Sequence, residues 1–295
     1  PDAGKGTVDT QIYFALFLAD DSIDYASYDT NADGDLTPEE LSVVVIFAGY
    51  ENSYGGINSK IPRVWGHKSA IGVPYESADA ATTLSWYTAF GERHATTSDV
   101  VDRIATIGIM CHELGHLMFG LPDLYDTDQS SEGIGEWGLM GSGSWNGVTL
   151  SGDSPAHMSA WSKMVTGMTT PTQITNAASG ATFLSAASNA AAKQLWIDKY
   201  KIRESFLVEN RQLSGYDAAL PGAGLLIWHV DGSQTSNSND ARRLVDLEEA
   251  DGLDELDSNA DRGDGGDPYP GTTSNIAFSG ASTPSSDSND NVATG

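Results

Sequence analysis

The sequence is poor in cysteine, in basic residues and in long apolar runs. Its one cysteine, Cys111, excludes the disulfide framework that holds many small secreted domains together. Only 15 residues are basic against 41 acidic ones, which gives a net charge of -26. A surface this negative repels phosphate backbones and anionic lipids, so we expect no nucleic-acid partner. No apolar run approaches the ~20 residues of a membrane helix, so we also expect no membrane insertion.

What the sequence does contain is enough apolar material for a sizeable core. Hydrophobic residues make up 39% of its 295 residues, and aromatic side chains are well represented among them. This length allows one large domain or two ordinary ones. Near residue 170 the texture changes to Ala, Ser and Thr with isolated large residues. We therefore expect one domain over 1–170 and a second part over 171–295 that ends in a flexible tail.

Local patterns predict a mixture of helices and strands, and hence an α/β (α+β) fold. The β-branched run at 42–49 is typical of a central strand, and further strand-like runs cover 204–209 and 224–230. An apolar stretch at 12–18 favours a helix. The clearest predicted helix begins near Ser98 and ends at Gly120. Another is expected over 154–166, with Pro155 near its first position.

The pentapeptide His-Glu-Leu-Gly-His at 112–116 is the strongest chemical signal. On a helix, positions i and i+4 share one face, so His112 and His116 can bind one metal ion together. Glu113 lies beside them, where it can take a proton from a water that zinc has made acidic. Two imidazoles and one further ligand leave the open position that a catalytic zinc site requires. A chance occurrence of this pattern in an ordinary helix is the alternative.

A third ligand is expected shortly after the helix. Gly120 turns the chain, and Asp123 is the first candidate beyond it, with Asp126 and Asp128 as alternatives that suit a solvated or calcium-binding loop better. Further along, Met140 lies in the Gly-rich segment 138–147. Its side chain could form an apolar floor beneath the imidazoles, which is hard to distinguish from ordinary core packing.

A second signal, at 29–40, points to calcium. The segment DTNADGDLTPEE places oxygen-bearing residues at the spacing of an EF-hand loop, with Gly34 at the position of the sharp turn. The predicted calcium ligands are Asp29, Asn31, Asp33, Asp35 and Glu40. A strand follows this loop, and no paired loop is present, so a structural clip is expected rather than a calcium sensor. A weakly binding acidic turn is the alternative.

Acidic residues also alternate with glycines in the C-terminal part. These could form a second calcium site, or simply a solvated loop. The candidate ligands are Asp257, Asn259, Asp261, Asp264 and Asp267.

Taken together, the motifs carry a resemblance to a known family. HELGH followed by GLPDLYDTD and WGLMGSGSWNG resembles the immune inhibitor A-like family of secreted bacterial zinc metallopeptidases, which is similar to the metzincins. DTNADGDLT, VWGHK, ESFLVENRQ, LEEADG and GDGGDPYPG also resemble this family, so the resemblance covers most of residues 10–280. One departure is the three residues between His116 and Gly120, where the family commonly has two.

The resemblance implies roles for individual residues and an architecture. His112, His116 and Asp123 would bind zinc, Glu113 would be the general base, and Met140 would lie in a Met-turn. The implied fold is a metzincin-like domain with a twisted mixed sheet and an active-site helix, plus a β-rich C-terminal part.

These inferences predict a secreted, extracellular zinc endopeptidase that hydrolyses proteins or peptides and is stabilised by calcium. A signal peptide and a pro-segment would precede the sequence, and a monomer is expected. Two other readings stay open. The chain could be a catalytically inactive calcium-stabilised surface or binding module, or a zinc hydrolase that acts on a non-protein substrate.

Overall fold

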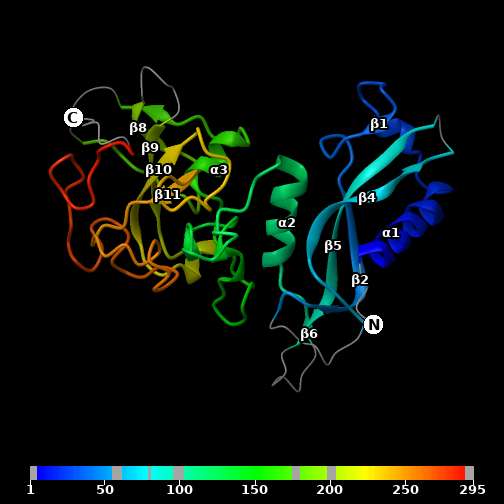
Figure 1. The fold of residues 1–295 in the computed structure, drawn as a ribbon, viewed down its shortest axis with the longest axis horizontal. Coiled ribbons are helices and arrows are strands. Elements are labelled where there is room, and N and C mark those ends of the chain that lie inside the picture. The colour runs from blue at the N-terminus through cyan, green and yellow to red at the C-terminus, as the bar shows by residue number, and fades with distance from the viewer. Residues whose placement is uncertain are drawn as a thin grey trace. The chain divides into compact units, whose positions relative to one another are not determined.

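The computed structural model describes residues 5–54, 62–78, 81–95, 103–174, 180–197 and 204–289. The chain forms two compact units, Pro1–Gly120 and Leu121–Gly295, and each unit has its own sheet (Figure 1). Helices and strands occur together, which confirms the predicted mixed α/β class. In the described part of the chain, no helix has the length and apolar character needed to cross a bilayer. The predicted domain boundary near residue 170 is based on composition alone and stays a prediction.

The sheet of the first unit is mixed and is organised around one long strand. Its strands are β1 (Asp35–Leu36), β2 (Val43–Glu51), β3 (Arg63–Val64), β4 (His67–Glu76), β5 (Thr83–His94) and β6 (Arg103–Ile104). Strand β5 pairs in parallel with β1 and β2, and antiparallel with β4 and β6. Strand β3 pairs in parallel with β2. The predicted strand at 42–49 therefore lies inside this sheet.

Helix α1 (Lys5–Asp20) packs on this sheet (Figure 1). Its buried side chains Val8, Ile12 and Leu16 recur every four residues, which places them on one face of the helix. They join a core that includes Tyr87 of β5, whose hydroxyl donates a hydrogen bond of 3.0 Å to Oδ1 of Asp9. The predicted helix at 12–18 is thus the second half of a longer element.

Helix α2 (Gly108–Phe119) begins later than the sequence predicts. The expected start near Ser98 is wrong: Arg103 and Ile104 form β6 against β5, while residues 98–102 lie outside the described residues. The edge of β5 offers backbone partners at this point, and this tertiary pairing overrides local helix propensity. The helix ends at Gly120, whose φ of 62° is left-handed and suits a residue without a Cβ.

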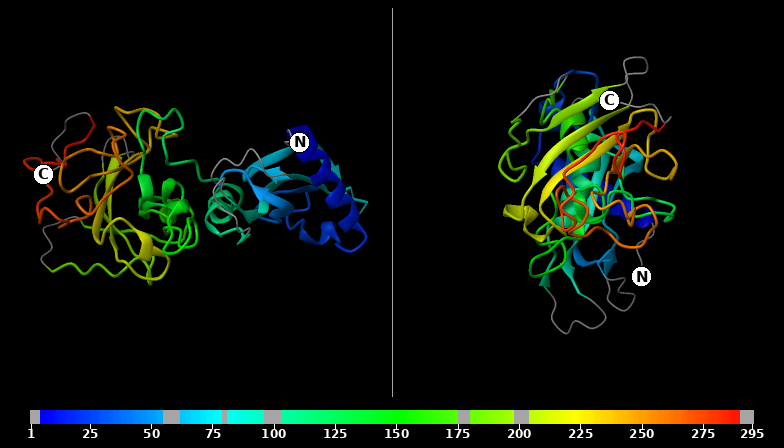
Figure 2. Two further views of the ribbon diagram at one scale, coloured as in Figure 1. Left: turned by 90° about the horizontal axis from the view of Figure 1, so that it is seen from below. Right: turned by 90° about the vertical axis from the view of Figure 1, so that its left-hand side faces the viewer.

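The second unit contains a five-stranded sheet in the order β11-β10-β9-β8-β7. Figure 2 gives two further views of the ribbon. The strands are β7 (Thr172–Gln173), β8 (Lys193–Ile197), β9 (Glu204–Arg211), β10 (Gly224–Asp231) and β11 (Val245–Leu247). The predicted strands at 204–209 and 224–230 lie within β9 and β10. One core cluster joins Phe206 and Val208 of β9 to Ile227 of β10.

Short helical turns precede this sheet. They are η2 (Gly135–Trp137), η3 (Ser142–Trp145) and α3 (Ala160–Val165), and η4 (Gly215–Ala219) follows β9. The helix predicted over 154–166 is shorter than expected because its first residues are bonded elsewhere. Ala156 N–H donates to the Gly143 carbonyl, and His157 N–H donates to Oδ1 of Asp217. Ser159 then caps α3 by accepting a hydrogen bond from Ser162 N–H.

Candidate metal centre and acidic clusters

Helix α2 brings the three motif residues of the first unit together. The Nε2 atoms of His112 and His116 lie 3.1 Å apart, and the two rings are nearly perpendicular, with an interplanar angle of 89°. A carboxylate oxygen of Glu113 lies within 4.8 Å of both imidazoles. His112 and Glu113 are buried, at 5% and 8% exposure. The motif therefore forms one compact donor group, as its spacing predicts.

This donor group fits a zinc ion. Two Zn–N bonds of about 2.0–2.1 Å at a tetrahedral angle separate their nitrogens by about 3.3 Å. The observed 3.1 Å between the Nε2 atoms is close to that separation. Neutral imidazole nitrogens and a carboxylate are ligand types that zinc accepts.

A buried glutamate beneath α2 holds the sheet that supports the helix. Glu51, at the end of β2, is fully buried and accepts hydrogen bonds from the N–H groups of Gly66 (2.7 Å) and Gly91 (3.0 Å). It thereby ties β2 to β5 and to the turn before β4. A Cβ at Gly66 would lie 2.9 Å from Ile109 Cγ1, so glycine permits the close approach of α2. Sequence reasoning did not assign Glu51 a role.

The other two candidates for the zinc site, Asp123 and Met140, belong to the second unit. Met140 is 1% exposed, and its carbonyl accepts a 2.8 Å hydrogen bond from Leu124 N–H, next to half-buried Asp123. The three residues between His116 and Gly120 all lie in α2, which continues through Phe119.

The alternative ligand Asp126 is bonded within its own loop. It is buried and accepts hydrogen bonds from Asp128 N–H, from Ser131 N–H and from both groups of Ser130. Burial raises its pKa, but the hydrogen bonds, that of the Ser130 hydroxyl first, outweigh burial and leave the pKa below its usual value. Asp126 therefore organises its own loop.

The predicted calcium loop at 29–40 is closed by its own side chains. Asp29 Oδ2 accepts a bond from Gly34 N–H, and Asn31 Oδ1 accepts one from Asp33 N–H, each 2.9 Å long. Gly34 has a φ of 82°, as the sharp turn requires. The Asp35 backbone pairs with Thr83 in the sheet. The other oxygen of Asp29, Oδ1, is buried without a hydrogen-bond partner, which suits a cation ligand.

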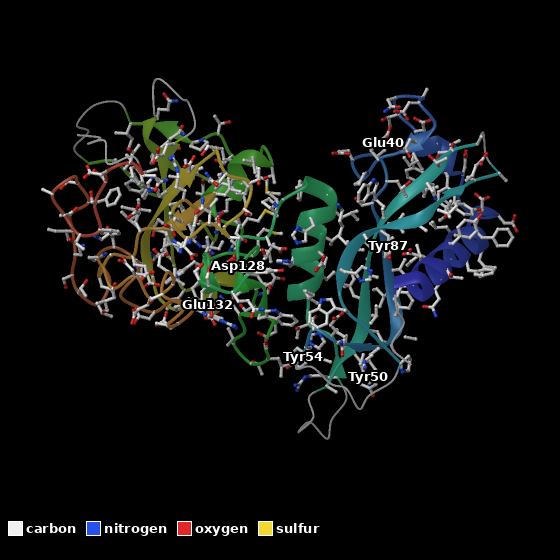
Figure 3. The ribbon with its side chains drawn as sticks, viewed as in Figure 1. Glu40, Tyr50, Tyr54, Tyr87, Asp128 and Glu132 are labelled. Carbon is white, nitrogen blue, oxygen red and sulfur yellow. The ribbon has the colours of Figure 1, made fainter. Side chains whose placement is uncertain are left out.

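Glu40 closes the same loop from its far end (Figure 3). Its Oε1 accepts from Thr30 N–H at 2.9 Å, and its Oε2 accepts from Thr37 N–H at 3.1 Å. The hydrogen bonds, that from Thr37 N–H first, lower the pKa of Glu40 to about 2. This carboxylate is therefore ionised at neutral pH, and an ionised carboxylate is the kind of ligand that a hard cation prefers.

In the second unit, the structure groups some of the predicted tail residues and separates others. Asp267 joins a set of buried and half-buried carboxylates that we call the acidic cluster, which consists of Glu249, Asp251, Glu255 and Asp267. Asp261 and Asp264 form a neighbouring group with Glu255. Asp257 instead pairs with Arg243 at 2.7 Å, and the Asn259 amide donates to the Gln129 carbonyl at 3.2 Å.

Two carboxyl groups of the acidic cluster have raised pKa values, as expected for buried carboxyl groups without a compensating positive charge. Burial, helped by the charge of Asp267, raises the pKa of Glu249 to about 8 although backbone N–H groups donate hydrogen bonds to it, and burial likewise raises the pKa of Asp267 to about 7. Oε2 of Glu255 is buried without a hydrogen-bond partner. Glu249 and Glu255 were not predicted, although both lie in the acidic stretch 248–255 just before the predicted ligands.

An α/β unit with two converging imidazoles and an adjacent glutamate on one helix has the donor set of a metal-dependent peptidase. Comparison with known proteins gives the family. A model described as "Immune inhibitor A peptidase M6, catalytic domain" matches residues 8–169, more than half of the chain, and the chain belongs to this family of metallopeptidases.

Named relatives agree with this assignment at modest identity. Immune inhibitor A of Bacillus thuringiensis subsp. alesti is 31% identical over 168 residues, which cover 55% of this chain and 23% of the relative. The pre-pro-metalloprotease PrtV of Vibrio cholerae serotype O1 (strain M66-2) is 27% identical over 158 residues, which cover 52% of this chain and 17% of the relative. The chain thus matches less than a quarter of either relative's length.

Proposed function

We propose that this chain is the catalytic part of a zinc-dependent endopeptidase that hydrolyses peptide bonds of protein substrates. One observation carries the proposal: the Nε2 atoms of His112 and His116 converge to 3.1 Å beside the carboxylate of Glu113. Membership in the M6 peptidase family and the metalloprotease relative support it. The "pre-pro" in the name of PrtV supports a secreted, extracellular location with a leader and a pro-segment.

In the proposed site, His112, His116 and Asp123 hold the zinc ion. When bound, zinc lowers the pKa of a coordinated water to about 7 and polarises a carbonyl. Glu113 takes the proton of the attacking water as general base and returns it to the leaving amine as general acid. Met140, buried in its turn, is the proposed Met-turn residue of a metzincin-like architecture, with the second sheet as the β-rich C-terminal part.

Calcium is the proposed structural cofactor. In the first unit, Asp29, Asn31, Asp33 and Glu40 would bind it through side chains, and Asp35 through its carbonyl oxygen, as in an EF-hand loop. In the second unit, the acidic cluster would hold a further ion, with Asp261 and Asp264 nearby. Both sets consist of hard oxygen donors, which are the ligands that calcium prefers. The structure gives Asp257 and Asn259 other partners, so we leave them out of this second site.

Casein hydrolysis by the wild-type chain and by Glu113→Gln tests the proposal, with zinc content measured in both. Glu113→Gln should retain zinc and lose about 10²- to 10⁴-fold in rate, as expected on removal of a general base. Glu92→Gln is the matched control, since this exposed glutamate of β5 lies outside every candidate site. It should cleave casein at the wild-type rate.

Two outcomes would contradict the proposal. A zinc-loaded wild-type chain that cleaves neither casein nor a peptide library would favour a binding module. An activity that Glu113→Gln retains in full would remove Glu113 from the chemistry.

A further inference from the structure

Four charged side chains are buried together in the second unit. Lys163 of α3, Glu209 and Arg211 of β9, and Asp217 of η4 are each at most 5% exposed. Lys163 Nζ lies 2.7 Å from Glu209 Oε2, and Arg211 Nη2 lies 2.6 Å from Asp217 Oδ1. The formal charges cancel. None of the four is used by the proposed chemistry.

Such a network is a poor way to gain stability. Removing ions from water costs several kcal/mol each, and a buried ion pair often stabilises a fold no better than apolar residues of the same size. Burial raises the pKa of Glu209, but the charges of Lys163 and Arg211 outweigh burial and keep that pKa below its usual value. Glu209 therefore stays ionised at neutral pH. The contribution of the network is to hold its side chains in one fixed geometry.

Arg211 is the member that contacts the segment before Met140. Its Nε and Nη2 bind both oxygens of Asp217, at 2.8 and 2.6 Å, which fixes the plane of the guanidinium group. Its Nη1 is thereby aimed at the carbonyl oxygen of Trp137, to which it donates a hydrogen bond of 3.1 Å. Trp137 itself is fully buried.

A second contact reaches the same segment through Asp217. Oδ1 of Asp217 accepts a 3.0 Å hydrogen bond from His157 N–H. The His157 carbonyl in turn accepts a 3.3 Å hydrogen bond from Leu139 N–H. The ion pair thus holds the chain on both sides of Gly138, immediately before Met140.

From this segment the contacts continue to Asp123. The Met140 carbonyl accepts a 2.8 Å hydrogen bond from Leu124 N–H, and the Leu124 carbonyl accepts 3.0 Å and 2.8 Å bonds from Ile134 N–H and the Asn237 amide. The backbone on the C-terminal side of Asp123 is therefore fixed by the turn that Arg211 supports.

We propose that Arg211, with Asp217, is a positioning residue that holds the Trp137–Met140 segment and, through it, the backbone beside Asp123. The inference rests on the proposed function in one respect, namely that Asp123 is a zinc ligand. The structural part of it concerns hydrogen bonds within the second unit alone.

Amide hydrogen exchange of the metal-free protein tests the structural part. Arg211→Lys keeps a positive charge but cannot make the three planar contacts. We expect the Leu124 and Leu139 amides to exchange at least about tenfold faster, while β10 amides keep their protection. Arg243→Lys is the matched control, because Arg243 is also buried and ion-paired, with Asp240, Asp246 and Asp257. It should leave both amides unchanged.

Zinc affinity, measured by competition with a chromogenic chelator, tests the functional part. Arg211→Lys should bind zinc about tenfold more weakly, as when an outer contact of a ligand is lost, and Arg243→Lys should not. If Arg211→Lys does not fold, Asp217→Asn replaces it, because it keeps the shape of the acceptor and removes its charge.

The outcomes separate the two proposals. Unchanged exchange at Leu124 and Leu139 in a folded Arg211 or Asp217 variant would overturn the positioning role, whatever the activity. Faster exchange with wild-type zinc affinity would confine the role of Arg211 to the backbone and overturn its proposed effect on zinc binding. A wild-type chain that binds zinc and cleaves neither casein nor the peptide library would overturn the peptidase function and leave the positioning role standing.

Discussion

The two compact units of the molecule build their polar sites in different ways. In the first unit, the candidate sites are contiguous: residues 29–40 form one loop and residues 112–116 form one helix face. In the second unit, the ion-paired network and the acidic cluster draw on distant segments, as when Lys163 meets Glu209 or Glu249 meets Asp267. Contiguous sites are shaped by local hydrogen bonds, whereas assembled sites exist only when the unit is folded.

The difference shows in the state of the carboxylates. Glu40 in the loop has a pKa lowered to about 2, because backbone and hydroxyl donors stabilise its charge. Glu249 in the acidic cluster has a pKa raised to about 8, because burial disfavours its charge. We infer that the first site is prepared without a cation, whereas the second is completed by one.

Calcium removal should give the largest effect and should fall on the second unit. An ion at 1,000 times its dissociation constant stabilises a fold by about 4 kcal/mol. On addition of EGTA, the Ala250 amide, which donates to the Asp267 carbonyl at 2.9 Å, should lose most of its protection against exchange. The Gly34 amide, which Asp29 holds, should lose less. Added calcium should restore both, and magnesium should not. A larger loss at Gly34 would reverse the comparison.

The pH dependence of the two units should have opposite signs, because each contains a buried histidine in a different state. Burial, with the charge of Arg103, lowers the pKa of His94 in the first unit to about 4. His229 in the second unit lies 2.9 Å from Glu204 and 3.1 Å from Glu248. These hydrogen bonds outweigh its burial and raise the pKa to about 9.

The signs follow from the ordinary histidine pKa of 6.5. The contribution of His94 is complete above pH 6.5 and is lost as the pH falls towards about 4. That of His229 is complete below pH 6.5 and is lost as the pH rises through about 9. Each amounts to roughly 3 kcal/mol. In calcium-saturated protein, exchange protection corrected for intrinsic rates should fall in β5 on acidification and in β10 on alkalinisation. Parallel behaviour of both strands would refute this assignment.

The smallest effect is expected from Gly34→Ala. Gly34 has a φ of 82° with no atom within 4 Å of an added Cβ, so the substitution costs conformational strain alone, about 1 kcal/mol. Gly180→Ala is the control in the second unit, since Gly180 has a φ of 77° and equally open surroundings. Urea unfolding should show the same loss for both variants, with or without calcium. A Gly34→Ala loss that appears only with calcium would mean that the loop forms on binding.

The contrast between contiguous and assembled sites also explains which features of the fold and of the sites the sequence predicts. The loop at 29–40 and the face shared by His112 and His116 were predicted, because spacing along one element determines which side chains meet. The strands β2, β9 and β10 were predicted from β-branched and apolar runs.

Features that depend on tertiary partners were not predicted. The start of α2 was placed too early because nothing local shows that Arg103 and Ile104 pair with β5. The second acidic site was predicted over residues 257–267, whereas the acidic cluster begins at Glu249. The sequence does not show this, because the return of Asp267 to Glu249 depends on the fold of the whole unit. No sequence motif predicts the turn that brings Arg211 and Asp217 together, so this pair was not predicted either.

The central place of β5 has a consequence for biosynthesis. Among the described strands of the first sheet, every pairing except the two-residue contact of β2 with β3 includes β5. A ribosome makes residues 83–94 only after β1, β2 and β4 have been synthesised, so those strands wait for their shared partner. The apolar run 43–47 should therefore stay exposed until β5 is available to pair with it.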